Sequence, residues 1–286
     1  MSIYLESFNL SSAPFSSTPD TRFYIETNLN ESLFNQMIGA INQDDGFVRI
    51  TGEAGAGKTI LCRKLLNALR SHATRYKVIH IPNPRLSEEG LYMAIAQELN
   101  LETSSTRKNL LTSIITNLSK QQTQEHRNTV FIVDEGQSMP DDTLEALTEL
   151  LDHCVEGRKL LRVALFSMPS DETQRDLPAF KLLHDRITLE KELQPLNAAG
   201  VARYIEARLN KVGAMSQVLY SEEAIALICK ASKGVPRLIN LLAHKSLLNT
   251  YNAGLPQVQA LQVRLAIAAT EFSATDETEF KANWLS

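Results

Sequence analysis

Cysteine is scarce in this sequence. Cys62, Cys154 and Cys229 are the three cysteines in 286 residues, and no two of them have the C-x-x-C spacing. An odd number of scattered thiols supports neither a disulfide framework nor a zinc site, so we expect reduced cysteines. The six histidines show no i, i+4 pairing and no neighbouring cysteine or acid cluster at metal-ligand spacing. A transition-metal site is therefore not expected.

Long apolar runs and an excess of basic charge are also missing. No stretch approaches eighteen apolar residues, and residues 1–10 have neither the basic start nor the apolar core of a signal peptide. The 29 Lys and Arg are outnumbered by 33 Asp and Glu, which gives a formal net charge of −4. We expect a cytoplasmic protein with no transmembrane segment of its own and no basic footprint for nucleic acid. The hydrophobic content of 43% suffices for a large α/β core and a smaller second domain.

A full phosphate-binding (Walker A) loop is present, Gly-Glu-Ala-Gly-Ala-Gly-Lys-Thr at residues 52–59. It follows an apolar run at 47–50 and precedes a helical stretch at 60–70, the context that this motif requires. The glycines allow backbone conformations that turn successive N–H groups toward phosphates at a helix N-terminus. Lys58 is expected to reach the β- and γ-phosphates and Thr59 the Mg²⁺. The alternative, a glycine-rich turn with a solvated lysine, fits this context poorly. The predicted nucleotide contacts in this segment are Gly52, Glu53, Ala54, Gly55, Ala56, Gly57, Lys58, Thr59 and Ile60.

Two acids follow a second apolar run. Residues 129–133 are suited to a buried parallel strand, and Asp134 and Glu135 come directly after it. Alone, such a pair is a weak signal, since acids commonly mark strand ends and helix caps. Placed after a phosphate loop, it reads as a Walker B motif. Asp134 is then expected to hold Mg²⁺ through water beside Thr59, and Glu135 to polarise the attacking water. A glutamate here favours ATP hydrolysis by the additional-strand class over a GTPase switch or a small-molecule kinase.

Periodicity predicts an α/β fold, a P-loop parallel-sheet sandwich with a small all-helical C-terminal lid. We expect four segments: an irregular arm at 1–27, a nucleotide-binding domain at 28–193, a lid at 194–272 and a tail at 273–286. Aromatic residues in the arm, including Phe15, Phe23 and Tyr24, are more typical of a hydrophobic clasp than of a base-stacking platform. Strands are predicted at 47–50, 76–81, 129–133, 160–166 and 186–189, and helices at 31–41, 60–70, 87–99, 107–119, 141–151, 198–212, 222–232, 236–251 and 258–270.

This order of parts resembles the AAA+ ATPases, and a spread of motifs narrows the resemblance to the ExeA/GspA-type secretion ATPases. The motifs run in order along nearly the whole chain: residues 4–10, 52–59, Asp-Glu-Gly-Gln at 134–137, 161–166, 186–187, 195–196 and Gly-Val-Pro-Arg-Leu-Ile-Asn at 234–240. The resemblance implies a nucleotide-dependent homo-oligomeric ring, such as a hexamer, that shares active sites between subunits. It also implies that ATP hydrolysis drives assembly or remodelling of a pilus or type II secretion apparatus, through a protein of the inner membrane.

The resemblance further implies roles for three residues. Arg237, in Gly-x-Pro-Arg at the start of a lid helix, is similar to the second sensor arginine, which contacts the γ-phosphate and closes the lid. Arg186 corresponds to an arginine that would act as a finger in the neighbouring subunit's site. Ser167 would be the first sensor, but Ser-Met-Pro-Ser at 167–170 departs from the usual Gly-Gln-Pro-Glu and would make hydrolysis slow. A surface arginine, an ion-paired arginine and a plain strand-end serine are the respective alternatives.

Two other functions stay open. One is a DNA-binding regulator of the AAA+ transposition-target or initiator type, against which the acidic balance and the lack of a winged-helix tail weigh. The other is a nucleotide-gated scaffold that binds ATP and scarcely hydrolyses it.

Overall fold

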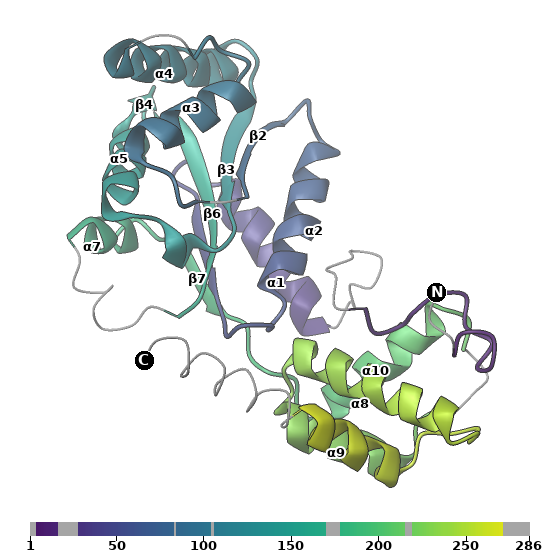
Figure 1. The fold of residues 1–286 in the computed structure, drawn as a ribbon. Coiled ribbons are helices and arrows are strands. Elements are labelled where there is room, and N and C mark those ends of the chain that lie inside the picture. The colour runs from purple at the N-terminus through teal and green to yellow at the C-terminus, as the bar shows by residue number, and fades with distance from the viewer. Residues whose placement is uncertain are drawn as a thin grey trace. The chain divides into compact units, whose positions relative to one another are not determined.

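The computed structural model describes residues 4–16, 28–82, 84–103, 106–169, 178–214 and 219–270. The chain divides into two compact units, each described separately below (Figure 1). We call them the sheet unit, Glu26–Ala54 with Lys58–Leu193, and the helical unit, Met1–Ile25 and Gln194–Ser286 together with Gly55–Gly57. None of the helices in the described part of the chain combines the length and hydropathy needed to span a bilayer.

The sheet unit contains a five-stranded parallel sheet in the order β2-β3-β6-β1-β7. Neighbours in this sheet are far apart in sequence, so each pair needs a crossover connection. In register, Val133 lies beside Leu165 and Thr51 beside Ser167, which brings the carboxyl ends of β3, β6 and β1 to one edge. The strands are β1 (Phe47–Thr51), β2 (Tyr76–Ile81), β3 (Asn128–Val133), β6 (Leu161–Ser167) and β7 (Leu189–Glu192).

Helices cover both faces of this sheet (Figure 1). Phe47, Val163 and Phe131 belong to one core cluster with apolar residues of four helices, α3, α4, α5 and α7. Val48 and Ile50 are fully buried outside this cluster, because alternate residues of a strand point to opposite faces. Helices α1 and α2 contact the sheet on that side. The helices of this unit are α1 (Asn28–Ile41), α2 (Lys58–Arg70), α3 (Glu88–Glu98), α4 (Arg107–Thr123), α5 (Asp141–Asp152) and α7 (Pro178–His184), with a 3₁₀ turn η2 (Gly136–Ser138) and a hairpin β4 (Cys154–Val155) and β5 (Arg158–Lys159).

The helical unit is built from α8 (Ala198–Asn210), α9 (Glu222–Ser232), α10 (Pro236–Asn252) and a helix at 260–270. Its core includes the N-terminal arm. The Tyr4 hydroxyl forms a hydrogen bond with His244 Nδ1 at 3.0 Å, and the Phe15 ring packs edge-on against the Tyr220 ring, with 5.9 Å between their centroids. Buried Arg208 donates through Nη1 to the Pro14 carbonyl oxygen at 2.9 Å. The described arm aromatics are thus buried in an apolar core, as a clasp requires, while Phe23 and Tyr24 lie outside the described residues.

Most predicted elements occur in the structure, with one clear displacement at the end of the sheet. The last strand, predicted at 186–189, is found at Leu189–Glu192. The N–H groups of Arg186 and Ile187 donate to carbonyls of α7, so these residues continue the turn that ends this helix. Pairing with β1 begins only where the Thr188 N–H reaches the Phe47 carbonyl at 2.9 Å. The predicted tail at 273–286 lies outside the described residues.

Gly234 and Gly254 form a matched pair for testing the packing of the helical unit. Both have positive φ, +77° and +64°, but a Cβ on Gly234 would lie 2.0 Å from the Leu196 carbonyl oxygen, whereas one on Gly254 meets nothing within 4 Å. Gly254→Ala should therefore lower the free energy of unfolding by about 1 kcal/mol, the cost of a left-handed backbone for a residue with a Cβ. Gly234→Ala should lower the free energy of unfolding by roughly 2 kcal/mol more, because the Leu196 backbone must move to make room for the Cβ. Urea denaturation followed by circular dichroism measures both, and equal losses would contradict the close approach of Leu196.

Candidate nucleotide-binding site

The phosphate loop connects the end of β1 to the start of α2. Gly55 and Gly57 adopt φ of +84° and +108°, a region that residues with a Cβ rarely occupy. Lys58 is the first residue of α2, two positions earlier than periodicity predicted, so the loop leads directly into a helix N-terminus. The free N–H groups and partial positive charge of such a terminus suit a phosphate.

Lys58 is the most constrained side chain of the loop. It is 5% exposed, and its Nζ donates to the carbonyl oxygens of Gly52 at 2.7 Å and Glu53 at 3.0 Å. Burial lowers the pKa of its ammonium, while the negative charges of Glu135, Asp134 and Glu53 oppose that shift. The ammonium is therefore partly dehydrated and lies within electrostatic range of the acid pair. A dehydrated cation of this kind interacts strongly with phosphate oxygens.

The acid pair ends β3 with a sharp change of backbone direction. Asp134 is 9% exposed, and its Oδ1 accepts the Glu135 N–H at 3.0 Å. Glu135 is exposed and has a left-handed backbone, with φ of 57° and ψ of 39°. For a residue with a Cβ, this conformation costs on the order of 1 kcal/mol and is typical of functional sites. The turn takes the Glu135 carboxylate out of the strand, while the Asp134 carboxylate stays buried.

Residues that would hold Mg²⁺ are present near the first turns of α2. The charge of Asp134 contributes to the pKa shifts of Lys58 and Cys62, which places its carboxylate within electrostatic range of that helix. The Thr59 hydroxyl and the Asp134 carboxylate are hard oxygen donors, the type that Mg²⁺ prefers. These residues fit a magnesium ion that arrives with a triphosphate.

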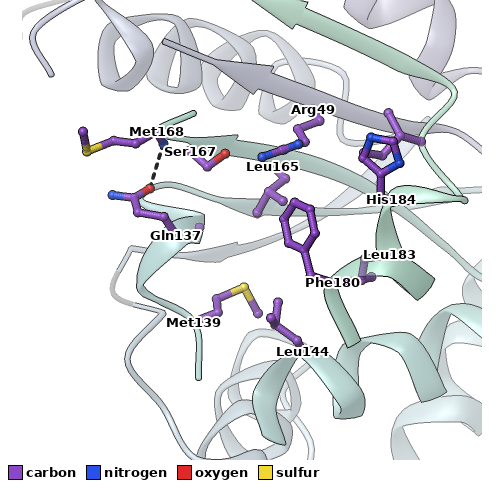
Figure 2. A pocket seen from close by; sticks show the side chains of 12 residues that line it. Arg49, Gln137, Met139, Leu144, Leu165, Ser167, Met168, Phe180, Leu183 and His184 are labelled. Atoms are coloured by element: carbon purple, nitrogen blue, oxygen red, sulfur yellow. Dashed lines mark hydrogen bonds between the residues drawn. The ribbon is translucent and has the colours of Figure 1, made fainter. Parts of the chain in front are cut away.

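Gln137 is a polar contact of this site that sequence reasoning missed. Its Nε2 donates to Glu135 Oε2 at 2.5 Å. Its Oε1 accepts the Met168 N–H at 3.0 Å, the contact that Figure 2 shows as a dashed line. In the sequence, Gln137 is part of the Asp-Glu-Gly-Gln motif, and no role follows from that motif alone. Local pattern could not reveal a contact with a residue 31 positions away.

Ser167 ends β6 with its hydroxyl turned into an apolar cavity (Figure 2). The side chain is 3% exposed, and its Oγ has no hydrogen-bond partner within the described residues. The cavity has a volume of about 50 Å³. Arg49, on the same wall, pairs with Glu190 at 2.7 Å and covers the Phe180 ring. The apolar lining consists of Met139, Leu144, Leu165, Met168, Phe180, Leu183 and Ile187.

The two arginines lie in different units. Arg186 follows α7 in the sheet unit, and its Nη1 donates to Asp152 Oδ1 at 2.6 Å. This hydrogen bond is the main reason that the pKa of Asp152 is lowered. Arg237 is the second residue of α10 in the helical unit, after Pro236. Of the predicted site residues, the structure thus brings Lys58, Asp134 and Glu135 into one electrostatic neighbourhood and places Arg186 in an ion pair.

Cysteine labelling tests the environment beside the acid pair. Cys62 on α2 is 2% exposed, and burial, helped by the charge of Asp134, raises its pKa to about 12. Cys154 is exposed. At pH 8, iodoacetamide should modify Cys154 in the folded protein and leave Cys62 untouched, because only the accessible thiolate reacts. Peptide mass spectrometry measures both, and urea-unfolded protein, in which both should react, is the control. Equal labelling rates in the folded protein would contradict this placement of Cys62.

Comparisons with known proteins agree with this architecture. Residues 41–175 match the AAA domain family. The chain is 31% identical over 266 residues to General secretion pathway protein A of Aeromonas hydrophila, covering 92% of this chain and 48% of that protein. The chain thus spans about half the length of this curated relative. The homology supports the resemblance to the ExeA/GspA-type proteins.

Solved structures show the same fold at low sequence identity. Cdc6p from Pyrobaculum aerophilum superposes with a TM-score of 0.66 at 14% identity, over 87% of this chain and 70% of that one. Drosophila ORC bound to DNA gives 0.65 at 18% identity, over 87% and 64%. At such identities the likeness concerns the fold alone. The predicted fold class is confirmed: this chain has the P-loop AAA fold, with a parallel sheet, a phosphate loop and a following helical unit.

Proposed function

We propose that this chain is a Mg²⁺-dependent ATPase. The observation that carries the proposal is the state of Lys58, a buried ammonium held by two loop carbonyls beside two strand-end acids. A side chain this constrained has a high desolvation cost, which a bound triphosphate would offset through charge-assisted hydrogen bonds. The match of residues 41–175 to the AAA domain family supports the same function.

Each residue has a distinct part in the proposed reaction. The N-terminus of α2 and Lys58 bind the phosphates of ATP, with Lys58 exchanging the Gly52 and Glu53 carbonyls for phosphate oxygens. Thr59 and Asp134 hold Mg²⁺, which neutralises charge on the phosphates when bound. Glu135, exposed beyond the strand end, orients the attacking water and draws its proton away.

Arg237, Arg186 and Ser167 complete the proposal in an assembled ring. Arg237 would contact the nucleotide from the start of α10 and couple its phosphates to the helical unit. Arg186 would enter a neighbouring subunit's site, for which it has to leave Asp152. Ser167 would contribute its hydroxyl, which has no partner within the described residues, as the first sensor.

We further propose that the ATPase acts in assembly or remodelling of a secretion or pilus apparatus, in particular an MSHA-type pilus. The homology with General secretion pathway protein A supports the secretion role. In this proposal the protein is cytoplasmic and is localised at the inner membrane by an integral partner. The likeness to Drosophila ORC bound to DNA concerns the fold alone and does not favour DNA binding here.

Nucleotide binding and hydrolysis are tested by Lys58→Ala and Glu135→Gln. Titration calorimetry should give binding heat for Mg·ATP with wild type and Glu135→Gln and none with Lys58→Ala. Steady-state hydrolysis should fall about 100-fold or more in Glu135→Gln, because the group that activates water is lost. Lys230→Ala and Glu89→Gln, exposed residues on α9 and α3, are matched controls. Absence of heat with folded wild type would refute the ATPase, and equal slow rates for wild type and Glu135→Gln would indicate a scaffold instead.

The cellular role is tested by affinity capture with Glu135→Gln, which should accumulate the ATP-bound state. We expect it to enrich an inner-membrane protein of a pilus or secretion assembly several-fold over Lys58→Ala, measured by quantitative mass spectrometry. Glu89→Gln should behave as wild type. Equal recovery with Glu135→Gln and Lys58→Ala would contradict a nucleotide-dependent partner.

A further inference from the structure

Gln137 makes a two-ended contact that the proposed function leaves without a role. Its side-chain amide lies between the Glu135 carboxylate and the Met168 backbone N–H, and Figure 2 shows the contact with Met168. A carboxylate can only accept and a backbone N–H can only donate, so a single orientation of the amide satisfies both partners. The NH₂ group must face Glu135, and the carbonyl oxygen must face Met168.

The backbone around Gln137 holds its side chain in this position. Glu135 has a left-handed backbone, and the next three residues form the 3₁₀ turn η2. This turn is closed by the Ser138 N–H, which donates to the Glu135 carbonyl oxygen at 2.8 Å. Gly136 is buried, and a Cβ there would lie 2.3 Å from Leu165 Cδ1, so the turn packs closely on β6. The turn therefore fixes the relative directions of residues 135 and 137.

The second end of the contact reaches the centre of the sheet. Met168 follows β6, whose last residue, Ser167, pairs with Thr51 directly before the phosphate loop. Strand β6 also pairs with β3, which carries the acid pair. Gln137 thus joins the exposed Glu135 side chain to the strand between the two halves of the nucleotide site.

We propose that Gln137 is a positioning residue for Glu135, which it holds in a fixed rotamer against the end of β6. This inference rests on the proposed ATPase function. An exposed glutamate samples several rotamers, and fixing one of them places the carboxylate for its water at a lower entropic cost during the reaction. Gln137 acts through Glu135, so its loss should lower kcat and leave nucleotide affinity unchanged.

Three variants separate positioning from a purely structural role. Gln137→Ala should lower kcat roughly 10-fold, with the Kd for Mg·ATP within about two-fold of wild type, because misplacement of a catalytic group slows the chemical step. Gln137→Glu can still accept the Met168 N–H but repels Glu135, so it should lower kcat at least as much while keeping that link to β6. Gln97→Ala, an exposed glutamine on α3, is the matched control.

A double-variant cycle supplies the decisive comparison. In the Glu135→Gln background, Gln137→Ala should cause little further loss, because the residue acts through Glu135. Wild-type kcat in Gln137→Ala or Gln137→Glu, or the same fold-loss in both backgrounds, would overturn the inference while leaving the ATPase intact. Failure of the ATPase itself shows separately, as absence of Mg·ATP binding heat in wild type or as equal slow hydrolysis by wild type and Glu135→Gln.

The contact can also be tested without turnover. In nucleotide-free protein, the NMR amide proton of Met168 should shift in Gln137→Ala and, to a smaller extent, in Glu135→Ala, because Glu135 orients the amide that Met168 contacts. The double variant should match Gln137→Ala alone. A Met168 resonance that does not respond to Glu135→Ala would overturn the positioning role, whatever the hydrolysis rate.

Discussion

The structure of the candidate site depends on the burial of one ammonium group. Lys58 is 5% exposed, and desolvation alone would favour its neutral form, as the direction of its pKa shift records. Two carbonyl oxygens of the loop and the charges of Asp134 and Glu135 stabilise the charged form of Lys58 in that position. The two acids follow β3, whereas Lys58 follows the loop after β1. The sheet topology is therefore what brings the acids within electrostatic range of Lys58.

The acids and the loop do not come from adjacent strands. Strand β6 lies between β3 and β1 and pairs with both, so the position of its end decides how the two halves of the site meet. Its last residue, Ser167, turns a buried hydroxyl into a cavity. The next residue, Met168, lines the same cavity with its side chain and donates its backbone N–H to Gln137. Met168 stands where the resemblance to the ExeA/GspA-type proteins would place a glutamine, so no side-chain amide is present at this strand end. Its backbone N–H still contacts a side-chain amide, that of Gln137 in the neighbouring turn.

The predictable parts of this structure are those encoded by local patterns. Apolar runs of four to seven residues became buried strands, and the glycine-rich loop was found between β1 and α2, because both signals depend on neighbours in the sequence. Three features depended on distant partners: the last strand is displaced from its predicted position, the role of Gln137 was missed, and the ion-paired alternative for Arg186 came without a partner. The last strand starts where Thr188 meets Phe47, Gln137 meets Met168, and Arg186 meets Asp152. Single-sequence periodicity carries no information on such pairings.

The N-terminal arm extends this argument to the chain as a whole. Tyr4 and Phe15 are buried in the core of the helical unit, and Arg208 Nη1 joins the Pro14 carbonyl to Asn240, 3.0 Å away on α10. The chain consequently leaves the helical unit after Ile25 and returns to it at Gly55–Gly57 and again at Gln194. It therefore passes between the units four times, after Ile25, Ala54, Gly57 and Leu193, where a simple domain-then-lid order would have one passage. Two of these passages flank the phosphate-loop glycines, and the last follows β7, the edge strand beside β1. Since β1 leads directly into the phosphate loop, the last passage follows the strand that pairs with the one before Lys58.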